Sequence, residues 1–166
     1  MISALVKWLV FIHVLGALTF YMAHGASAAM ALKIRKETDL RRICAMLDLS
    51  TSTLTVMFSA FLVMGLSGLV LPFLIKIWDR GYIWLSIVLL VVVVVYMAAF
   101  NQGIFSELRR LVGLPYRRGN KDFPAEAPAS REAVTAQLGK INVAALAIVG
   151  YVVPSVVLWL MVFKPF

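Results

Sequence analysis

The sequence has few charged residues for its length, and this scarcity excludes an ordinary soluble domain. Of the 166 residues, 14% are charged and 62% are hydrophobic, and the mean hydropathy is +0.92. Soluble domains carry about 25% charged residues and about half apolar residues. The composition therefore indicates an integral membrane protein.

Cysteine and the sequence motifs of catalysis are also scarce. The single cysteine, Cys44, excludes an intramolecular disulfide and a metal site made only of cysteine. The sequence contains no glycine-rich phosphate loop, no HExxH zinc motif and no GxSxG nucleophile turn. No carboxylate lies inside a long apolar run, so the acids that pumps and cation carriers use are missing. These absences favour a protein without catalytic activity.

Long apolar runs, by contrast, are abundant. Four runs reach the roughly 20 residues that a helix needs to cross ~30 Å of hydrocarbon, and they lie at residues 8–31, 53–75, 82–105 and 141–163. Backbone groups in lipid must bond within their own segment, so each run is predicted as a helix. The expected fold is all-α, with one transmembrane domain over residues 1–166. It is an integral membrane four-helix antiparallel bundle, connected at residues 32–52 and 106–140.

Lysine and arginine are divided unequally between the two sides of this bundle. Twelve of the sixteen lie in the connections 32–52 and 106–140, and the other four are Lys7, Lys76, Arg80 and Lys164. Positively charged loops remain on the cytoplasmic side, so both connections are predicted to be cytoplasmic and both termini outside. The net charge of +8 is then explained by topology and by contact with anionic membrane lipids. No nucleic-acid motif is present, and no nucleic-acid partner is expected.

Two segments of the cytoplasmic connections have helical periodicity. Leu40, Ile43, Cys44 and Leu47 share one helix face, so the second helix is predicted to begin before the membrane, with Thr38 or Asp39 as its cap. In the other connection, Ser130 is the expected cap of a helix that leads directly into the fourth span. Both segments are predicted to be amphipathic extensions of the spans.

The only two histidines, His13 and His24, both lie in the first apolar run. Eleven residues separate them, which on a helix corresponds to one face and about 16 Å along the axis. Small residues around them allow neighbouring helices to come close, and Gly16, Gly65 and Gly68 are expected at helix contacts. Ionisable residues inside a membrane face the bundle interior or a site. The histidine face is therefore predicted to point into the bundle or into a protein interface.

Two interpretations of these histidines remain open. In one, each imidazole forms a hydrogen bond to a polar side chain or a backbone carbonyl. In the other, His13 and His24 are axial ligands of haem b or ligands of copper. The second axial ligand would then be a methionine or a residue of another subunit or symmetry-related copy, or the iron would be five-coordinate. Met57 and Met64 lie seven residues apart on one face of the second helix, and Met22 lies near His24 in the sequence.

The first apolar run resembles the first helix of a known group of membrane proteins. The segment "LVKWLVFIHVLGALTFYMAHGASAAMALKIRK" is similar to that helix in small bacterial four-helix proteins related to the CopD membrane domain, and more loosely to HemJ-type haem-binding proteins. The second segment, "VMFSAFLVMGLSGLVL", shares the likeness to a lesser degree. The resemblance implies a multi-pass protein of the bacterial inner membrane, with His13 at the position of a haem or metal ligand.

Two functions follow as hypotheses. The first is a non-catalytic accessory or scaffold subunit of a membrane complex, with membrane lipids and other membrane subunits or further copies of itself as partners. The alternative is a haem- or copper-binding membrane redox protein that uses the histidines of the first helix.

Overall fold

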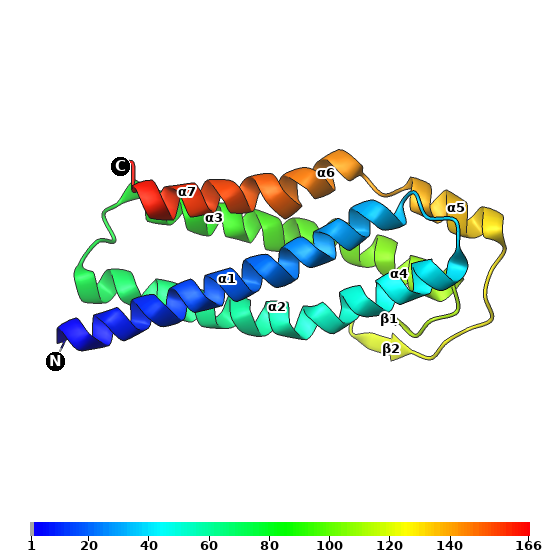
Figure 1. Cartoon of the computed structure of the whole chain (residues 1–166), viewed down its shortest axis with the longest axis horizontal. Coiled ribbons are helices and arrows are strands. Elements are labelled where there is room, and N and C mark those ends of the chain that lie inside the picture. Colours follow the sequence, from blue (N-terminus) through cyan, green and yellow to red (C-terminus); the bar gives the residue numbers. More distant parts are fainter. Residues whose placement is uncertain (1) are drawn as a thin grey trace.

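The computed structural model describes residues 2–166, apart from the side chains of Ile2 and Asn101, and most of these residues are helical. Four helical segments are long and apolar enough to cross a membrane: Ser3–Ile34, Leu40–Ile75, Gly81–Leu111 and Val143–Phe163 (Figure 1). The first three contain the predicted apolar runs in full, and the fourth begins two residues inside its run. A helix is the structure that bonds every backbone group within a single segment. The prediction of four helices that are long and apolar enough to span a membrane is confirmed.

The first two long helices are α1 (Ile2–Ile34) and α2 (Leu40–Ile75). Asp39 is the N-cap of α2, as expected, and its side chain accepts a hydrogen bond of 2.9 Å from the backbone N–H of Arg41. At the other end, Lys76 adopts a left-handed conformation with a φ of 56°, and its N–H bonds to the Pro72 carbonyl. Such a cap satisfies a carbonyl that the helix end leaves free.

The third and fourth apolar runs each contain a π-helical segment. The third run forms α3 (Gly81–Tyr96), the π-helix η1 (Met97–Asn101) and α4 (Gln102–Leu111). The fourth forms α6 (Val143–Ala147), the π-helix η2 (Ile148–Val152) and α7 (Val153–Phe163). A π segment inside an α-helix shifts the hydrogen-bond pattern locally and often occurs at functional sites.

The connection between α4 and α6 adds an element that was not predicted and corrects one sequence prediction. The added element is a small antiparallel hairpin of β1 (Tyr116–Arg118) and β2 (Lys121–Phe123) in an otherwise helical fold. Gly119 permits the turn with a φ of 60°. Ser130 caps α5 (Arg131–Gly139) as expected, but α5 does not lead directly into the fourth span. The helix stops at Lys140, and Asn142 caps α6 as a new helix.

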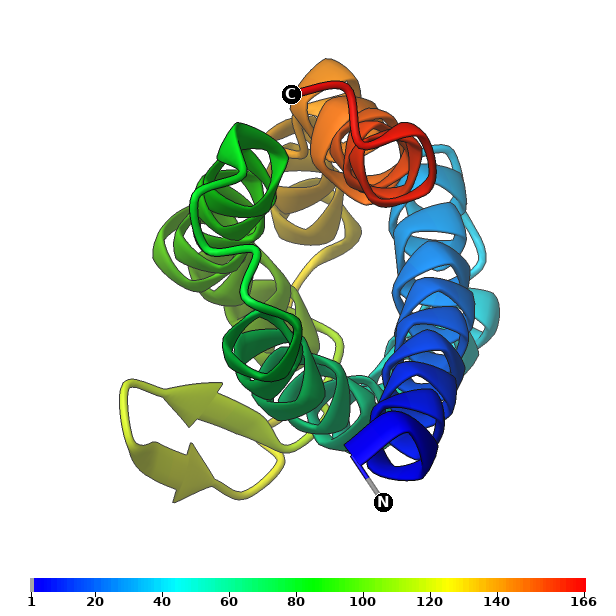
Figure 2. The same cartoon turned by 90° about the vertical axis from the view of Figure 1, so that its left-hand side faces the viewer.

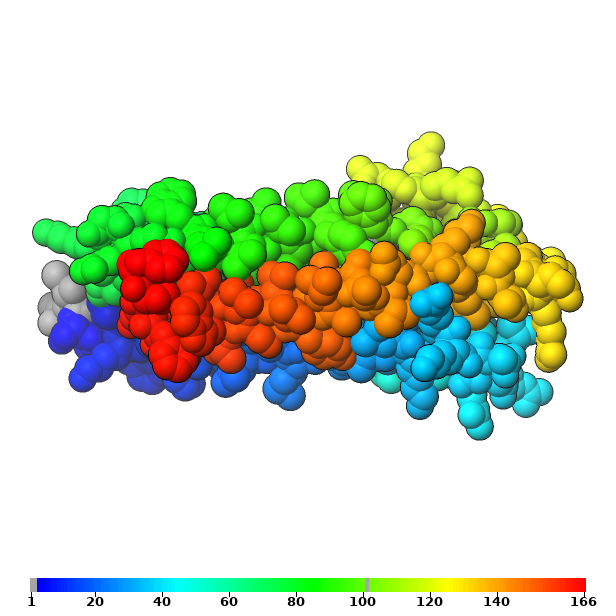
Figure 3. Space-filling model, turned by 90° about the horizontal axis from the view of Figure 1, so that it is seen from above, coloured from blue at the N-terminus to red at the C-terminus, as the bar shows by residue number. Residues whose placement is uncertain are grey.

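The spanning helices run side by side, with both termini at one end (Figures 1 and 2). We call this the terminal end. The opposite end, which holds the α1–α2 turn, α4, the hairpin and α5, is called the basic end. Helix α1 packs along α2, and α3 packs along α7, while α1 also contacts α6 and η2. Figure 3 shows α7 lying lengthwise beside α3, with α1 on its other side.

Among the residues that the structure describes, buried side chains form three separate clusters. The largest lies at the basic end and joins α1, α2, α4, α5 and α6 around Leu108, which is 0% exposed. A smaller cluster in the spanning part contains Phe20, Ala60 and Met64, and a third near the terminal end contains Tyr82, Ile83 and Leu160. The outward faces of the spans carry large apolar side chains.

Candidate functional site

His13 lies on α1 and forms its hydrogen bonds with α2. Its Nδ1 lies 2.9 Å from the Met64 carbonyl oxygen and 3.3 Å from the Ser67 hydroxyl oxygen. A carbonyl oxygen only accepts, so Nδ1 carries the proton and donates it. In the neutral ring Nε2 then has a free lone pair. This is the arrangement by which proteins orient a histidine whose other nitrogen binds a metal.

Two glycines make room for this contact. A methyl group on Gly16 would lie 3.0 Å from the Met64 nitrogen and 3.3 Å from the Ala60 carbonyl oxygen, so α1 and α2 approach each other through their backbones. A methyl group on Gly68 would lie 2.8 Å from Cε1 of His13. Gly65 was predicted at a helix contact, and this prediction is wrong. Apart from the neighbouring residues and the backbone of α2 itself, no heavy atom of the described residues lies within 4 Å of a methyl group placed on Gly65.

His24 contacts the fourth span instead of α2. It is 3% exposed, its Nε2 lies 3.4 Å from the Val149 carbonyl oxygen, and its ring stacks on Phe20 at 5.3 Å. Val153 N–H bonds to the Ile148 carbonyl in the i→i−5 pattern of η2. The next donor in that pattern would be residue 154, but Pro154 has no N–H. His24 therefore donates to the carbonyl that Pro154 leaves without a helical donor.

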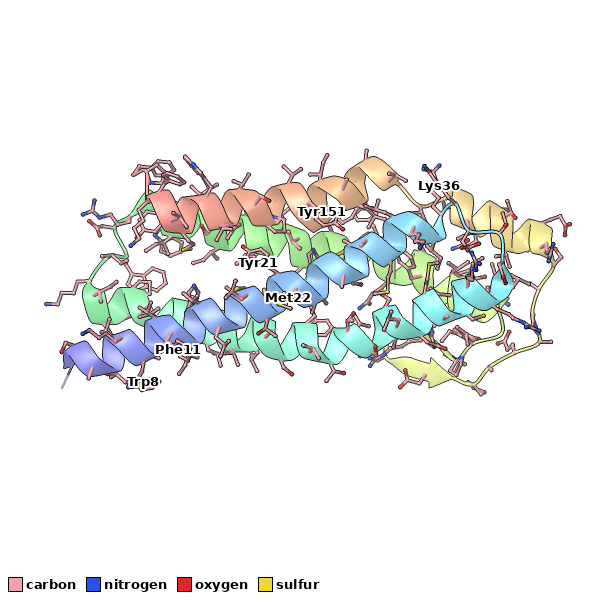
Figure 4. All side chains as sticks on the ribbon, viewed as in Figure 1. Trp8, Phe11, Tyr21, Met22, Lys36 and Tyr151 are labelled. Atoms are coloured by element: carbon pink, nitrogen blue, oxygen red, sulfur yellow. The ribbon has the colours of Figure 1, made fainter. Side chains whose placement is uncertain are left out.

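Two tyrosines join the same pair of helices. The Tyr21 hydroxyl donates to the Pro154 carbonyl at 3.1 Å, and the Tyr151 hydroxyl donates to the Gly25 carbonyl at 3.1 Å. Figure 4 labels Tyr21 on α1 and Tyr151 on η2. Neither tyrosine was predicted as a contact residue. The available signal was a hydroxyl inside each of two apolar runs, because polar groups in lipid require a hydrogen-bond partner.

The methionines considered as ligands lie in two different environments. The side chains of Met57 and Met64 belong to the apolar cluster around Phe20 and Ala60, and Met64 contacts His13 through its backbone carbonyl. Met22 is 75% exposed, so its thioether lies away from the His24 ring, which is buried. Within residues 2–166, no three histidine, cysteine or acidic side chains form a group that suits a metal ion.

The two histidines thus contact different helices. His13 connects α1 to α2, and His24 connects α1 to η2, in each case through a backbone carbonyl. His24 has its proton on Nε2 and His13 has its proton on Nδ1, because both acceptors are carbonyls. Helix α1 is therefore hydrogen-bonded to both the second and the fourth spans. Of the two histidines, only His13 has an unprotonated Nε2 with a free lone pair.

Comparisons with known proteins assign no family to the chain. No family model, no curated protein and no solved structure matches it.

Proposed function

We propose that this protein is a non-catalytic accessory or scaffold subunit of a complex in the bacterial inner membrane. Its four spans form an antiparallel bundle with both termini outside and with amphipathic helix extensions in the cytoplasm. Its partners are membrane lipids and a transmembrane helix of another subunit or of a second copy.

The observation that carries this proposal is a groove between α1 and α2 on the surface of the spanning part. The groove has a volume of about 410 Å³, and its lining includes Gly16, Ala60 and the hydroxyl residues Thr19, Thr55 and Ser59. In lipid, helices associate through close backbone approach and hydrogen bonds between helices, since lipid tails are as apolar as leucine. Small residues beside hydroxyls therefore suit a partner helix better than they suit lipid tails alone.

The distribution of charged and aromatic residues supports the proposed orientation. The basic end holds most of the lysines and arginines, and positively charged loops remain in the cytoplasm. Trp78 and Trp84 lie with ring centroids 5.3 Å apart at the terminal end, where tryptophans anchor helices at the membrane interface.

Site-specific crosslinking in membranes tests the proposal. In a Cys44→Ser background, Ser59→Cys in the groove is labelled with a reagent that carries one thiol-reactive and one photoreactive group. Illumination is then expected to give an adduct of one defined mass. Leu62→Cys on an exposed part of α2 is the matched control and is expected to give none. The mass identifies the partner as a second copy or another subunit. Equal behaviour of the two positions would contradict the groove as a helix contact.

A haem- or copper-binding redox function is a second candidate because of one observation at His13. The bond from Nδ1 to the Met64 carbonyl orients the ring and leaves Nε2 as a possible ligand atom. The residues fit one axial position of haem b, which would supply one-electron transfer. His24 uses its Nε2 proton on Val149, so a ligand role for it would require the other nitrogen.

An absorption spectrum separates the two candidates. Protein purified from cells supplied with haem is expected to show a Soret band only if the second candidate is correct, and His13→Ala should then abolish it. His24→Ala should weaken or shift the band. A wild-type protein that binds neither haem nor copper would exclude this candidate and leave the accessory function as the remaining proposal.

A further inference from the structure

The hairpin of β1 and β2 is held against α4 where the third apolar run ends. That run extends to Phe105. In the next turn, the Ser106 hydroxyl donates to the Arg117 carbonyl, and Arg109 Nε donates to the Pro115 carbonyl at 2.7 Å. These bonds hold β1 at the level where apolar residues give way to charged ones. In a spanning helix this level is the membrane interface.

The hairpin lies on the flank of the helices instead of extending beyond their end. Figure 1 shows it at the level of α4, which β1 contacts, while α5 lies farther out along the long axis. In the end-on view of Figure 2 it projects sideways from the helices. A segment that projects sideways at the interface faces the lipid headgroups around the bundle, not the aqueous space beyond it.

The charged side chains of the hairpin are mostly basic. Arg117, Arg118 and Lys121 are exposed, against the single acid Asp122. The side chains of Arg117 and Arg118 are 65% and 69% exposed, and their ion pairs with Asp122 and Glu107 measure 3.6 and 3.5 Å. Ion pairs at such exposed positions contribute little free energy. These cations are therefore available to an external anion.

We infer that the hairpin 116–123 binds the phosphate headgroups of anionic phospholipids in the leaflet at the basic end. This rests on the proposed membrane insertion and adds a lipid class and a binding element to it. An apolar contact accompanies the charges, since the Phe123 ring stacks on Tyr116 at 5.2 Å and remains partly exposed. Anionic lipids of the cytoplasmic leaflet attract basic segments near the membrane surface. The position, charge and exposure of the hairpin all match such a surface.

Native mass spectrometry of the full chain in detergent tests the inference. The protein is mixed with equal amounts of phosphatidylglycerol and phosphatidylcholine, and the ratio of the two bound lipids is measured. The wild type is expected to prefer phosphatidylglycerol. The variant R117Q/R118Q/K121Q should reduce the preference at least about fivefold, which corresponds to one basic residue near an anionic surface. R117K/R118K keeps the charge and should retain the preference.

The matched control, R35Q/K36Q/R131Q, removes the same charge from exposed positions outside the hairpin. An equal loss in this control would overturn a role specific to the hairpin, as would an unchanged ratio in the hairpin variant. Hairpin-dependent capture of soluble polyglutamate without lipid preference would assign these cations to an acidic cytoplasmic partner instead. The crosslink at residue 59 is independent of the hairpin, so failure here leaves the accessory function standing.

Discussion

At the basic end, buried aliphatic side chains from α1, α2, α4, α5 and α6 form one continuous cluster. In the spanning part, α1 and α2 instead meet through the backbone at Gly16 and through the hydrogen bond from His13 to Met64. Large apolar side chains there mostly face outward. The two regions belong to one set of helices, yet different interactions hold them together.

The surrounding solvent explains this difference. Beyond the membrane, burying an apolar side chain removes it from water, which stabilises the fold by about 25 cal/mol per Å². Inside lipid that driving force between helices is absent, and close packing and hydrogen bonds replace it. Large residues therefore carry the contact at the basic end. In the spans, glycines, imidazoles and tyrosines add to the smaller apolar clusters around Phe20 and Leu160. Three substitutions and one pH titration test this difference between the basic end and the spanning part.

The largest effect is expected from Leu108→Ala, which would break the cluster at the basic end. Leu108 is 0% exposed, so its truncation leaves a cavity and should destabilise the protein by about 2–5 kcal/mol. Thermal unfolding in detergent measures the change. Leu62→Ala is the control because Leu62 is 61% exposed in the span, and it should be nearly neutral. Equal losses of stability in the two variants would mean that the buried cluster at the basic end contributes no more than an exposed apolar side chain in the span.

A smaller effect is expected from Gly16→Leu, which would separate the helices of the spanning part. The first carbon of the added side chain would already lie 3.0 Å from the Met64 nitrogen, and a backbone atom cannot easily move away. The free energy of unfolding is therefore expected to fall by about 1–3 kcal/mol. Gly65→Leu places the same side chain in open space on α2 and should leave the melting temperature unchanged or higher. A loss at Gly65 alone would show that α1 and α2 meet through a different face.

His24→Leu tests the contribution of a hydrogen bond between helices in the spanning part. It removes the donor to the Val149 carbonyl and is expected to cost about 0.6–1.7 kcal/mol, the range for hydrogen bonds between membrane helices. Pro154→Ala restores a backbone N–H that can serve that carbonyl, so His24→Leu should cost less in that background. A double-mutant cycle of unfolding free energies measures the coupling. His13→Leu, which acts on α2, should show the same cost with Pro154 or Ala at position 154.

The smallest effect is a pH dependence of the hairpin outside the spans. The Tyr116 hydroxyl donates to Glu126 at 2.5 Å and, with Arg110, lowers the pKa of Glu126 below its ordinary value of 4.5. The same bond raises the pKa of Tyr116 above 10.0. Because the carboxyl pKa is lower in the folded state, the ionised Glu126 stabilises the fold at pH values above the ordinary carboxyl pKa. This stabilisation is lost as the pH falls through the folded-state pKa. Because the tyrosine pKa is higher in the folded state, the protonated Tyr116 hydroxyl stabilises the fold below pH 10.0. This stabilisation is lost as the pH rises through the folded-state pKa of Tyr116.

Hydrogen exchange of residues 116–123, corrected for intrinsic rates, checks this pH dependence. Protection should be constant between about pH 5 and about pH 9 and should fall on both sides of that window. Tyr116→Phe removes the donor and should flatten the profile. A profile that is the same in wild type and in this variant would show that Glu126 does not hold the hairpin.

The sequence was sufficient for the features that depend on local composition. The four apolar runs are helical, and Asp39 and Ser130 cap the helices as expected, because a cap side chain bonds to its own turn. Asn142 escaped the prediction although an asparagine before an apolar run is a start signal for a helix. Gly119 followed by Asn120 is a second local signal, typical of a tight turn, and this turn permits the hairpin.

By itself, the sequence determined that the chain has four apolar helices long enough to span a membrane, where α2 and α5 begin, and that both histidines lie on α1. Only the tertiary structure decided which partner each histidine meets, that Gly16 and Gly68 are covered while Gly65 is open, and that the hairpin lies along the flank. The reason is that capping and apolar length act within a few residues, whereas these contacts depend on the rotation and depth at which one helix meets another. Residues 51 positions apart, such as His13 and Met64, are brought together only by that packing.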